Sequence, residues 1–149
     1  MKKIICFVSI LSLTFMLSSC ASAPKAWLTD EELCEKKNYQ KCHDLGMNSF
    51  NEKDFCKAAD FYEKACNGGF MESCTLLGDS HANGDCGKQD NCKAVGFYEK
   101  ACNGGNMLGC SYLGDSYENG WCVTKDLDRA MELYKRACEE GGVNCKKLR

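Results

Sequence analysis

The chain has 149 residues, of which 14 are cysteine, and its formal net charge is −2. This length suits one domain, and the mild acidity without a basic cluster argues against nucleic acid as a partner. So high a cysteine content is typical of exported proteins, in which disulfides persist.

The N-terminal segment has the pattern of an export signal. Lys2 and Lys3 precede an apolar run at 4–17 that is too short and too sharply ended for a spanning helix. The run ends in Leu17-Ser18-Ser19-Cys20, which resembles the lipobox of bacterial lipoprotein precursors, although an ordinary signal peptide with a chance cysteine is the alternative. The resemblance implies cleavage before Cys20 and acylation of that residue, which holds a protein on a membrane without a spanning segment.

The domain organisation that we expect follows from this segment. It comprises a lipoprotein signal peptide at 1–19, a lipidated tether at 20–28 and a repeat solenoid at 29–149. The protein would then be exported and membrane-anchored, facing the periplasm or the cell surface.

The rest of the chain repeats itself at a period of 36 residues. The string "FYEKAC" stands at 61–66 and at 97–102, and "LYKRAC" stands at 133–138. Apolar residues lie at helical spacing in each string, and a second apolar series follows, so each unit contains two helices. We expect helix pairs near 29–50, 54–81, 90–118 and 126–148, the last of which the chain end cuts short.

Helix pairs that repeat in this way stack into an α-solenoid, in which each unit buries its apolar face on its neighbours. We therefore predict an all-α fold, an α-solenoid of about four disulfide-stapled helix hairpins. A Leu-Gly pair marks the same point of three units, at 45–46, 77–78 and 113–114. Because glycine inside a helix costs about 1 kcal/mol, its recurrence indicates close contact between helices.

Cysteines eight positions apart flank a double glycine in two units, as in "ACNGGNMLGC" at 101–110. Residues eight apart on one helix are separated by about 12 Å, whereas the Cα atoms of a disulfide lie closer than roughly 7 Å. The chain must therefore reverse between them, and glycine permits the left-handed conformation that ends a helix. We expect such pairs to bridge the two helices of each hairpin: Cys34–Cys42, Cys66–Cys74, Cys102–Cys110 and Cys138–Cys145.

Four cysteines remain once Cys6 of the signal peptide, the lipid cysteine Cys20 and the eight cysteines of the hairpin pairs are set aside. The repeat symmetry favours pairing Cys56 with Cys86 and Cys92 with Cys122, which uses one geometry twice and closes the open end of each hairpin. The alternative, Cys86 with Cys92, would leave the other two cysteines two units apart.

The combined pattern resembles the Sel1-like repeat, a relative of the tetratricopeptide repeat. The resemblance rests on the period, on Leu-Gly-Asp-Ser-Tyr-Glu-Asn-Gly at 113–120, and on Lys125-Asp126 followed by Ala130, and it covers residues 34–145. The cysteine pairs narrow it to the cysteine-rich Sel1-like proteins first described from Helicobacter, from which the chain departs by a tighter last pair and four additional cysteines. Members of that family are described as penicillin-binding proteins and slow β-lactamases, so the resemblance implies binding and slow hydrolysis of β-lactams.

The groups that β-lactam hydrolysis needs are sparse in this sequence. Serine β-lactamases combine S-x-x-K with S-D-N and K-T-G elements. Downstream of the signal the chain has only Ser22-Ala23-Pro24-Lys25, in the expected tether, where nothing would hold a nucleophile in register. A metal-dependent route would need more ligands than His43 and His81, and no C-x-x-C motif is present. We therefore expect no metal and no cofactor, assign no catalytic residue, and interpret both histidines as surface or packing residues.

A candidate binding face lies on the first helices of the units. A basic residue recurs at one position of the repeat, and an acidic residue stands one turn earlier in two of the units. The residues of this face are Asp60, Lys64, Lys100, Glu132 and Arg136. Related repeats bind ligands on this concave face, and a basic ladder could receive a peptide carboxylate, whereas an ordinary solvated repeat face is the alternative.

Three functions remain open from the sequence. The first is a lipid-anchored binding module, the second a weak β-lactam hydrolase, and the third a structural envelope component without saturable binding or turnover. The partners expected are a peptide, a peptidoglycan fragment or β-lactam, or a protein on the concave face, and a membrane through lipid at Cys20. We expect no nucleic-acid partner and a monomeric protein.

Overall fold

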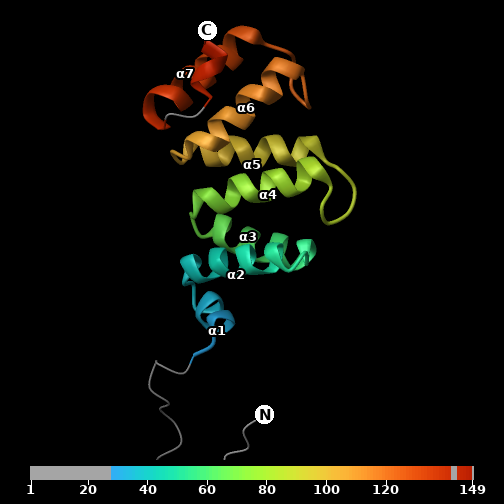
Figure 1. Cartoon of the computed structure of the whole chain (residues 1–149), viewed down its shortest axis with the longest axis vertical. Helices are drawn as coiled ribbons and strands as arrows, with labels where there is room; N and C mark the ends of the chain where they lie inside the picture. Colours follow the sequence, from blue (N-terminus) through green and yellow to red (C-terminus); the bar gives the residue numbers. More distant parts are fainter. Residues whose placement is uncertain (1–27, 142–143, 149) are drawn as a thin grey trace, which may run out of the picture.

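The computed structural model describes residues 28–141 and 144–148. The helices stack one on another from α1 at one end to α7 at the other (Figure 1). The elements are α1 (Asp30–Glu35), α2 (Tyr39–Asn51), α3 (Phe55–Asn67), α4 (Met71–Asn83), α5 (Asn91–Asn103), α6 (Met107–Asn119), α7 (Leu127–Gly141) and the 3-10 turn η2 (Cys145–Leu148). The described residues contain no strand, and the predicted all-α solenoid of disulfide-stapled hairpins is confirmed.

Short polar side chains begin the helices where the sequence changes from turn to periodic pattern. Asp54 and Asp90 accept hydrogen bonds from the backbone N–H groups three residues on, at the starts of α3 and α5. Such N-caps satisfy backbone donors that have no partner within the helix. Between the helices of a hairpin, Gly69 and Gly105 take φ values of +93° and +90°, which only glycine adopts readily. The Asn-Gly-Gly strings are therefore the turns that reverse the chain.

The two end units are incomplete in regular structure. α1 has only 6 residues, and the second element of the last unit is the 4-residue turn η2. The central helices α2 to α6 each have 13 residues, so the complete hairpins lie in the middle of the stack.

The recurring glycine of the second helix lies against a tyrosine ring of the next unit. A Cβ atom on Gly78 would lie 2.6 Å from Cε1 of Tyr98, and Gly46 and Gly114 face their own tyrosine rings at 2.5 and 2.6 Å. These distances leave no room for a methyl group. The close helix contact that the sequence indicates is therefore the contact between one unit and the next.

Six disulfides bridge the helices. Four close a hairpin, with Cα–Cα distances of 4.8, 4.7, 4.4 and 4.8 Å, at Cys34–Cys42, Cys66–Cys74, Cys102–Cys110 and Cys138–Cys145. Two tie the start of a first helix to the loop after its second helix, at Cys56–Cys86 and Cys92–Cys122. The four short pairings are those expected from the cysteine spacing, the two long ones are those that the repeat symmetry favours, and Cys86 does not pair with Cys92.

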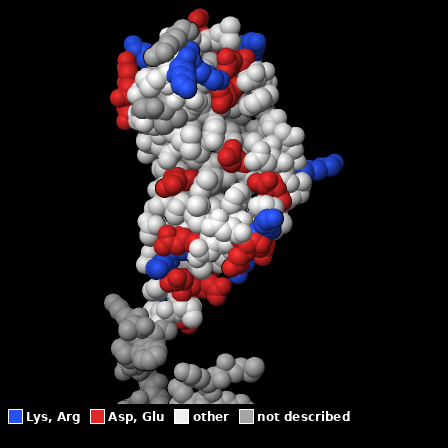
Figure 2. Space-filling model, viewed as in Figure 1, with Lys and Arg blue, Asp and Glu red and all other residues white. Residues whose placement is uncertain are grey.

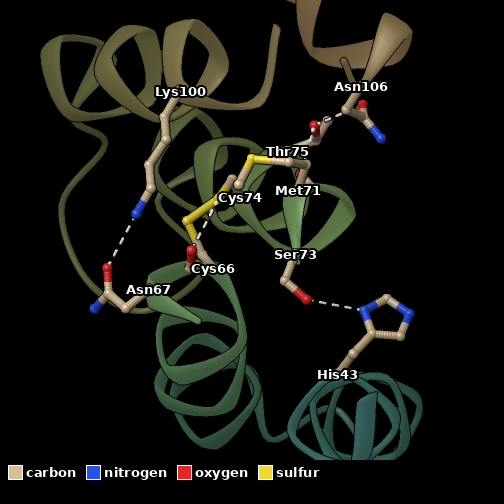
Figure 3. The surroundings of a disulfide bond; sticks show 9 residues. All are labelled: His43, Cys66, Asn67, Met71, Ser73, Cys74, Thr75, Lys100 and Asn106. Carbon is tan, nitrogen blue, oxygen red and sulfur yellow. Dashed lines mark hydrogen bonds between the residues drawn. A yellow bond between two sulfur atoms is a disulfide. The ribbon is translucent and has the colours of Figure 1, made fainter. Parts of the chain in front are cut away.

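The two histidines pack against aromatic rings. His43 is buried, and its Nδ1 lies 2.9 Å from the Ser73 hydroxyl (Figure 3). Its ring centroid lies 4.6 Å from that of Phe70. The His81 ring stacks on Phe97 with the centroids 5.5 Å apart. Within the described ranges, no group of three or more His, Cys, Asp or Glu residues could hold a metal ion.

The predicted signal peptide, lipid cysteine and tether fall almost wholly at residues 1–27, outside the described residues. Of the helices in residues 28–141 and 144–148, none combines the length and the apolar character that a membrane crossing needs.

Candidate functional site

The main cavity opens between α4, α5 and α6 and has a volume of about 390 Å³. It is lined by Asp79, Ala82, Asn83, Gln89, Asn91, Ala94, Tyr98, Tyr112, Asp115, Ser116 and Trp121. Its wall thus combines two carboxylates, three large aromatic side chains and several amides. Most of these residues come from α4 and α6, the second helices of two successive units, and from α5 between them, whereas Gln89 and Trp121 come from the loops that follow α4 and α6.

A smaller cavity of about 110 Å³ lies one repeat earlier. Its lining includes Met47, Phe50, Tyr62, Leu76 and Asp79, which occupy the same repeat positions as five residues of the main cavity. The main cavity is therefore one member of a row that the repeat generates. Both cavities contain two carboxylates, but the main cavity is larger and has three large aromatic side chains and three amides, whereas Met47, Phe50 and Leu76 give the smaller one an apolar wall.

One hydrogen bond recurs at the base of this row. The hydroxyl of each tyrosine that covers a helix glycine donates to the residue after that glycine: Tyr62 to Met47 Sδ at 3.2 Å, Tyr98 to Asp79 Oδ1 at 3.1 Å, and Tyr134 to Asp115 Oδ1 at 2.7 Å. Burial, and secondarily the charge of Glu72, raises the pKa of Tyr62 to about 12. These hydroxyls therefore remain protonated donors at neutral pH.

Asp79 is the carboxylate of the main cavity that forms no ion pair with another described residue. Burial raises its pKa, an effect that the hydrogen bond from Tyr98 partly offsets. No ion pair between described residues includes Asp79. The Tyr112 ring lies against the Tyr98 ring, with centroids 5.2 Å apart, and forms an aromatic wall beside the carboxylate. The cavity can therefore receive a cationic group with apolar flanks.

The same position of the next unit is already occupied by a cation. Lys147 Nζ, from η2, donates to Asp115 Oδ1 at 2.5 Å, to Glu118 Oε2 at 2.6 Å and to the Tyr134 hydroxyl oxygen at 2.9 Å. The ammonium also lies 4.6 Å from the centroid of the Tyr134 ring. Burial disfavours the charge, but these hydrogen bonds raise the pKa of Lys147 overall.

Replacing this lysine, Lys147→Met, is expected to raise the pKa of Glu118 toward its ordinary value. Hydrogen bonds from Lys147 and Tyr134 lower that pKa in the folded protein. A lowered carboxyl pKa contributes stability above the ordinary pKa, and this stability is lost as the pH falls through the lowered value. The measurement is an NMR titration of the Glu118 side-chain carboxyl carbon in both proteins.

The matched control for this titration is Lys135→Met. Lys135 lies on α7 and pairs with Glu139 at 3.9 Å, and both side chains are largely exposed. This variant removes the same charge but should leave the Glu118 titration unchanged. Equal shifts in both variants would indicate a long-range charge effect, and no shift in Lys147→Met would contradict the contact.

The candidate face from the sequence lies elsewhere on the first helices. Lys100 is about 200° around α5 from Tyr98, so it points away from the main cavity. Its Nζ donates to Asn67 Oδ1 at 3.2 Å (Figure 3). Lys64 Nζ similarly contacts Glu35 in the preceding unit. Cations near the C-terminal ends of helices are favourable there. Lys64 and Lys100 thus each connect their own unit to the preceding one.

Three further residues of that face, Asp60, Glu132 and Arg136, line neither the main cavity nor the smaller one. Arg136 pairs with Glu140 at 3.4 Å and contacts Cys102 Sγ at 3.7 Å, whereas Asp60 and Glu132 are exposed. Lys64 alone lines a cavity, a shallow one of about 300 Å³ beside Tyr39.

The residues of the main cavity were not predicted from the sequence, although the repeat contains a signal for them. The Asp of Leu-Gly-Asp-Ser stands 19 residues before the tyrosine that donates to it in both complete cases, Asp79 with Tyr98 and Asp115 with Tyr134. A charged residue at a constant distance from a core tyrosine marks a contact between units. That distance links different units, so inspection of single helices does not reveal it.

The serine of the main cavity is engaged in helix structure. Ser116 is buried, and its hydroxyl donates to the Tyr112 carbonyl oxygen at 2.9 Å. Ser22 and Lys25 of the S-x-x-K string lie outside the described residues. The Ser116 hydroxyl proton is therefore directed to a backbone carbonyl oxygen rather than to a general base.

One face of the stack carries mainly acidic charged side chains in its middle part (Figure 2). Figure 2 shows Asp and Glu side chains spread over the middle and lower parts of the face drawn, with Lys and Arg side chains at its edges and near the α7 end. An acidic surface of this kind attracts partners with basic segments.

Comparisons with known proteins bear on the repeat. The family profile described as Sel1 repeat matches residues 52–70, 72–106 and 108–142. Among curated proteins, cytochrome c oxidase assembly factor 7 of Mus musculus is 37% identical over 54 residues, a match that covers 30% of this chain and 23% of that protein. The chain thus matches less than a quarter of that relative's length.

Solved structures share the arrangement of helices over 80% of this chain. A Sel1 repeat protein from Oxalobacter formigenes is 24% identical with a TM-score of 0.72, and 93% of that chain is covered. The protective antigen c5321 of uropathogenic Escherichia coli is 27% identical with a TM-score of 0.75, and 27% of that chain is covered. Helicobacter pylori cysteine rich protein B is 29% identical with a TM-score of 0.63, and 89% of that chain is covered.

Proposed function

Because the chain belongs to the Sel1 repeat family, we propose that it is a binding protein that holds a segment of a protein partner in the main cavity between α4, α5 and α6. Repeat solenoids use extended surfaces built from successive units for binding. The observation that carries the proposal is the row of equivalent cavities, of which the largest combines aromatic walls with a carboxylate that lacks an ion pair within the described residues.

The size and chemistry of the cavity support a peptide segment as ligand. A volume of about 390 Å³ accommodates one or two side chains rather than a folded surface. Asn83, Gln89 and Asn91 at its margin supply amide groups that can pair with an extended backbone. Trp121, at 48% exposure, is an aromatic side chain available to a partner.

The proposal includes export and a lipid anchor at Cys20, which rest on the sequence pattern of residues 1–20. Such an anchor would place the cavity on a membrane surface. Metabolic labelling with a fatty-acid analogue tests it: the protein should become labelled, whereas the Cys20→Ala variant should not.

Hydrolysis of β-lactams rests on the family resemblance alone. The serine that lines the cavity is bonded to a backbone carbonyl, so no observation of the site adds to that hypothesis. Turnover of a chromogenic cephalosporin by the oxidised protein, lost on reduction, would establish it.

Site-specific photo-crosslinking in the producing cell tests the binding function. A crosslinking amino acid at Trp121, on the rim of the main cavity, is expected to join the protein to one discrete partner, and Tyr112→Ala should weaken this product because it removes a cavity wall. Met131, on α7 and 49% exposed, is the matched control position and should give no such product. Equal products at both positions, or none at Trp121, would contradict the proposal.

A further inference from the structure

Lys147 is an example from within the chain of the kind of group that binds beside the Asp–Tyr pair of a unit contact. This ammonium is held by two carboxylates, a tyrosine hydroxyl and the face of the same tyrosine ring. Such a combination of charge-assisted hydrogen bonds and a cation–π contact is selective for a compact cation on an apolar stem. η2 thus acts as an internal ligand for the last position in the row.

The main cavity is the same position one unit earlier. Asp79 stands in the place of Asp115, Tyr98 in the place of Tyr134, and both pairs form the same hydrogen bond. Tyr112, two residues after the second hairpin cysteine, stands in the place of Lys147. The carboxylate and the tyrosine are therefore retained, whereas no ammonium from the described part of the chain pairs with Asp79.

Two differences determine the shape of the main cavity. Ala82 replaces Glu118, which removes one carboxylate and opens space beside Asp79. Asp115 closes the other side of the cavity, but its charge is already paired with Lys147. The charge that still needs a partner belongs to Asp79, and the neighbouring tyrosine rings offer apolar surface for the stem of the ligand.

We propose that the main cavity binds the ammonium group of a lysine side chain from the partner, with Asp79 as its counter-ion and with Tyr98 and Tyr112 along its methylene stem. This inference rests on the proposed binding function and names the chemistry that the partner supplies. A carboxylate that is partly removed from water attracts a cation more strongly than an exposed carboxylate does, because the effective dielectric constant around it is lower.

The test is an NMR titration of the oxidised full chain with the peptide acetyl-Ala-Ala-Lys-Ala-Ala-amide, which suits weak binding. Saturable shifts are expected at the backbone amides of Gln89 and Asn91, which line the cavity. The same peptide with Nε-acetyl-lysine keeps the stem but loses the charge, and should bind about tenfold more weakly or not at all. Equal binding of both peptides would overturn the inference, as would tighter binding of an arginine peptide.

Variants of the protein complete the test. Asp79→Asn should weaken binding of the lysine peptide about tenfold. It should not unfold the protein, because the amide still accepts the Tyr98 hydrogen bond and carries no charge to desolvate. Asp60→Asn removes the same charge from an exposed position of α3 outside the cavities and should leave binding unchanged. A similar loss of peptide binding in both variants would assign the effect to the net charge of the protein and would contradict a binding site at Asp79.

Failure of this inference is distinguishable from failure of the binding function. If Trp121 crosslinks to a discrete partner while the lysine peptide causes no shift at Gln89 and Asn91, the cavity binds a partner by other chemistry and the inference alone is wrong. If the peptide saturates the cavity while no crosslink forms in the cell, the lysine site stands and the proposed partner is wrong.

Discussion

Reduction of the six disulfides is expected to abolish most of the helical circular dichroism of the protein under conditions in which the oxidised protein stays folded. In the chain-entropy treatment, the short hairpin bridges contribute about 2.5 kcal/mol each and the two long ones about 3.7 kcal/mol each. Their total of about 17 kcal/mol is an upper limit, but it exceeds the usual net stability of roughly 5 to 15 kcal/mol.

The composition of the core explains why the bridges matter so much. Among the described residues, the buried leucines are only Leu77, Leu113 and Leu133, whereas six cysteines are buried. Alanines fill much of the remaining space between helices and bury little apolar area each. Without the bridges, the hydrophobic term would have to offset the full conformational entropy of the chain.

The Cys92–Cys122 bridge allows the stabilising effect of a disulfide to be measured separately from the loss of buried packing. Cys92 and Cys122 are exposed, so replacing both by serine removes a bridge with little loss of buried contact. The expected loss in the free energy of unfolding, measured by urea titration, is at most about 3.7 kcal/mol. A fully reduced sample that retains its helical signal would show that the helices hold together by packing alone. A serine pair as stable as the parent would show that this one bridge does not stabilise the fold.

The helices could be predicted closely from the sequence because their signals are local. The pair expected near 54–81 is α3 and α4, and the turn between them falls at the Asn-Gly-Gly string, where Gly69 has its positive φ. N-caps, turn glycines and apolar spacing all act within a few residues, so each helix is specified by its own segment. Because these local signals recur every 36 residues, the stack of similar helix pairs could be predicted as well.

The site could not be predicted in the same way, because its contacts cross between units. Lys64 and Lys100 form a conspicuous basic column, but in the structure they bind Glu35 and Asn67 of the preceding unit. Asp79 looks like one of many exposed acids until the packing of Tyr98 places it in a cavity. Lys147, near the chain end, gave no periodic signal at all, since the last unit lacks a second helix.

A single methyl group at the contact between units is expected to destabilise the protein. In Gly78→Ala the new Cβ would lie 2.6 Å from Cε1 and 2.8 Å from Cδ1 of Tyr98. The ring cannot move away freely, because Tyr98 is only 5% exposed and its hydroxyl is bonded to Asp79. Overpacking costs of up to about 3 kcal/mol outweigh the helix-propensity gain of about 1 kcal/mol, so the net loss should be about 2 kcal/mol.

The same substitution at Gly96 is the matched control, and it should have the opposite sign. Gly96 lies in the middle of α5, and a Cβ atom added there would meet no atom within 4 Å, so alanine gains helix propensity of about 0.5 to 1 kcal/mol without a clash. Urea titration of the oxidised proteins measures both changes. In a Tyr98→Ala background the clash at Gly78 disappears, and Gly78→Ala should then become neutral or stabilising. A loss that persists in that background would place its cause in α4 itself rather than in the contact between units.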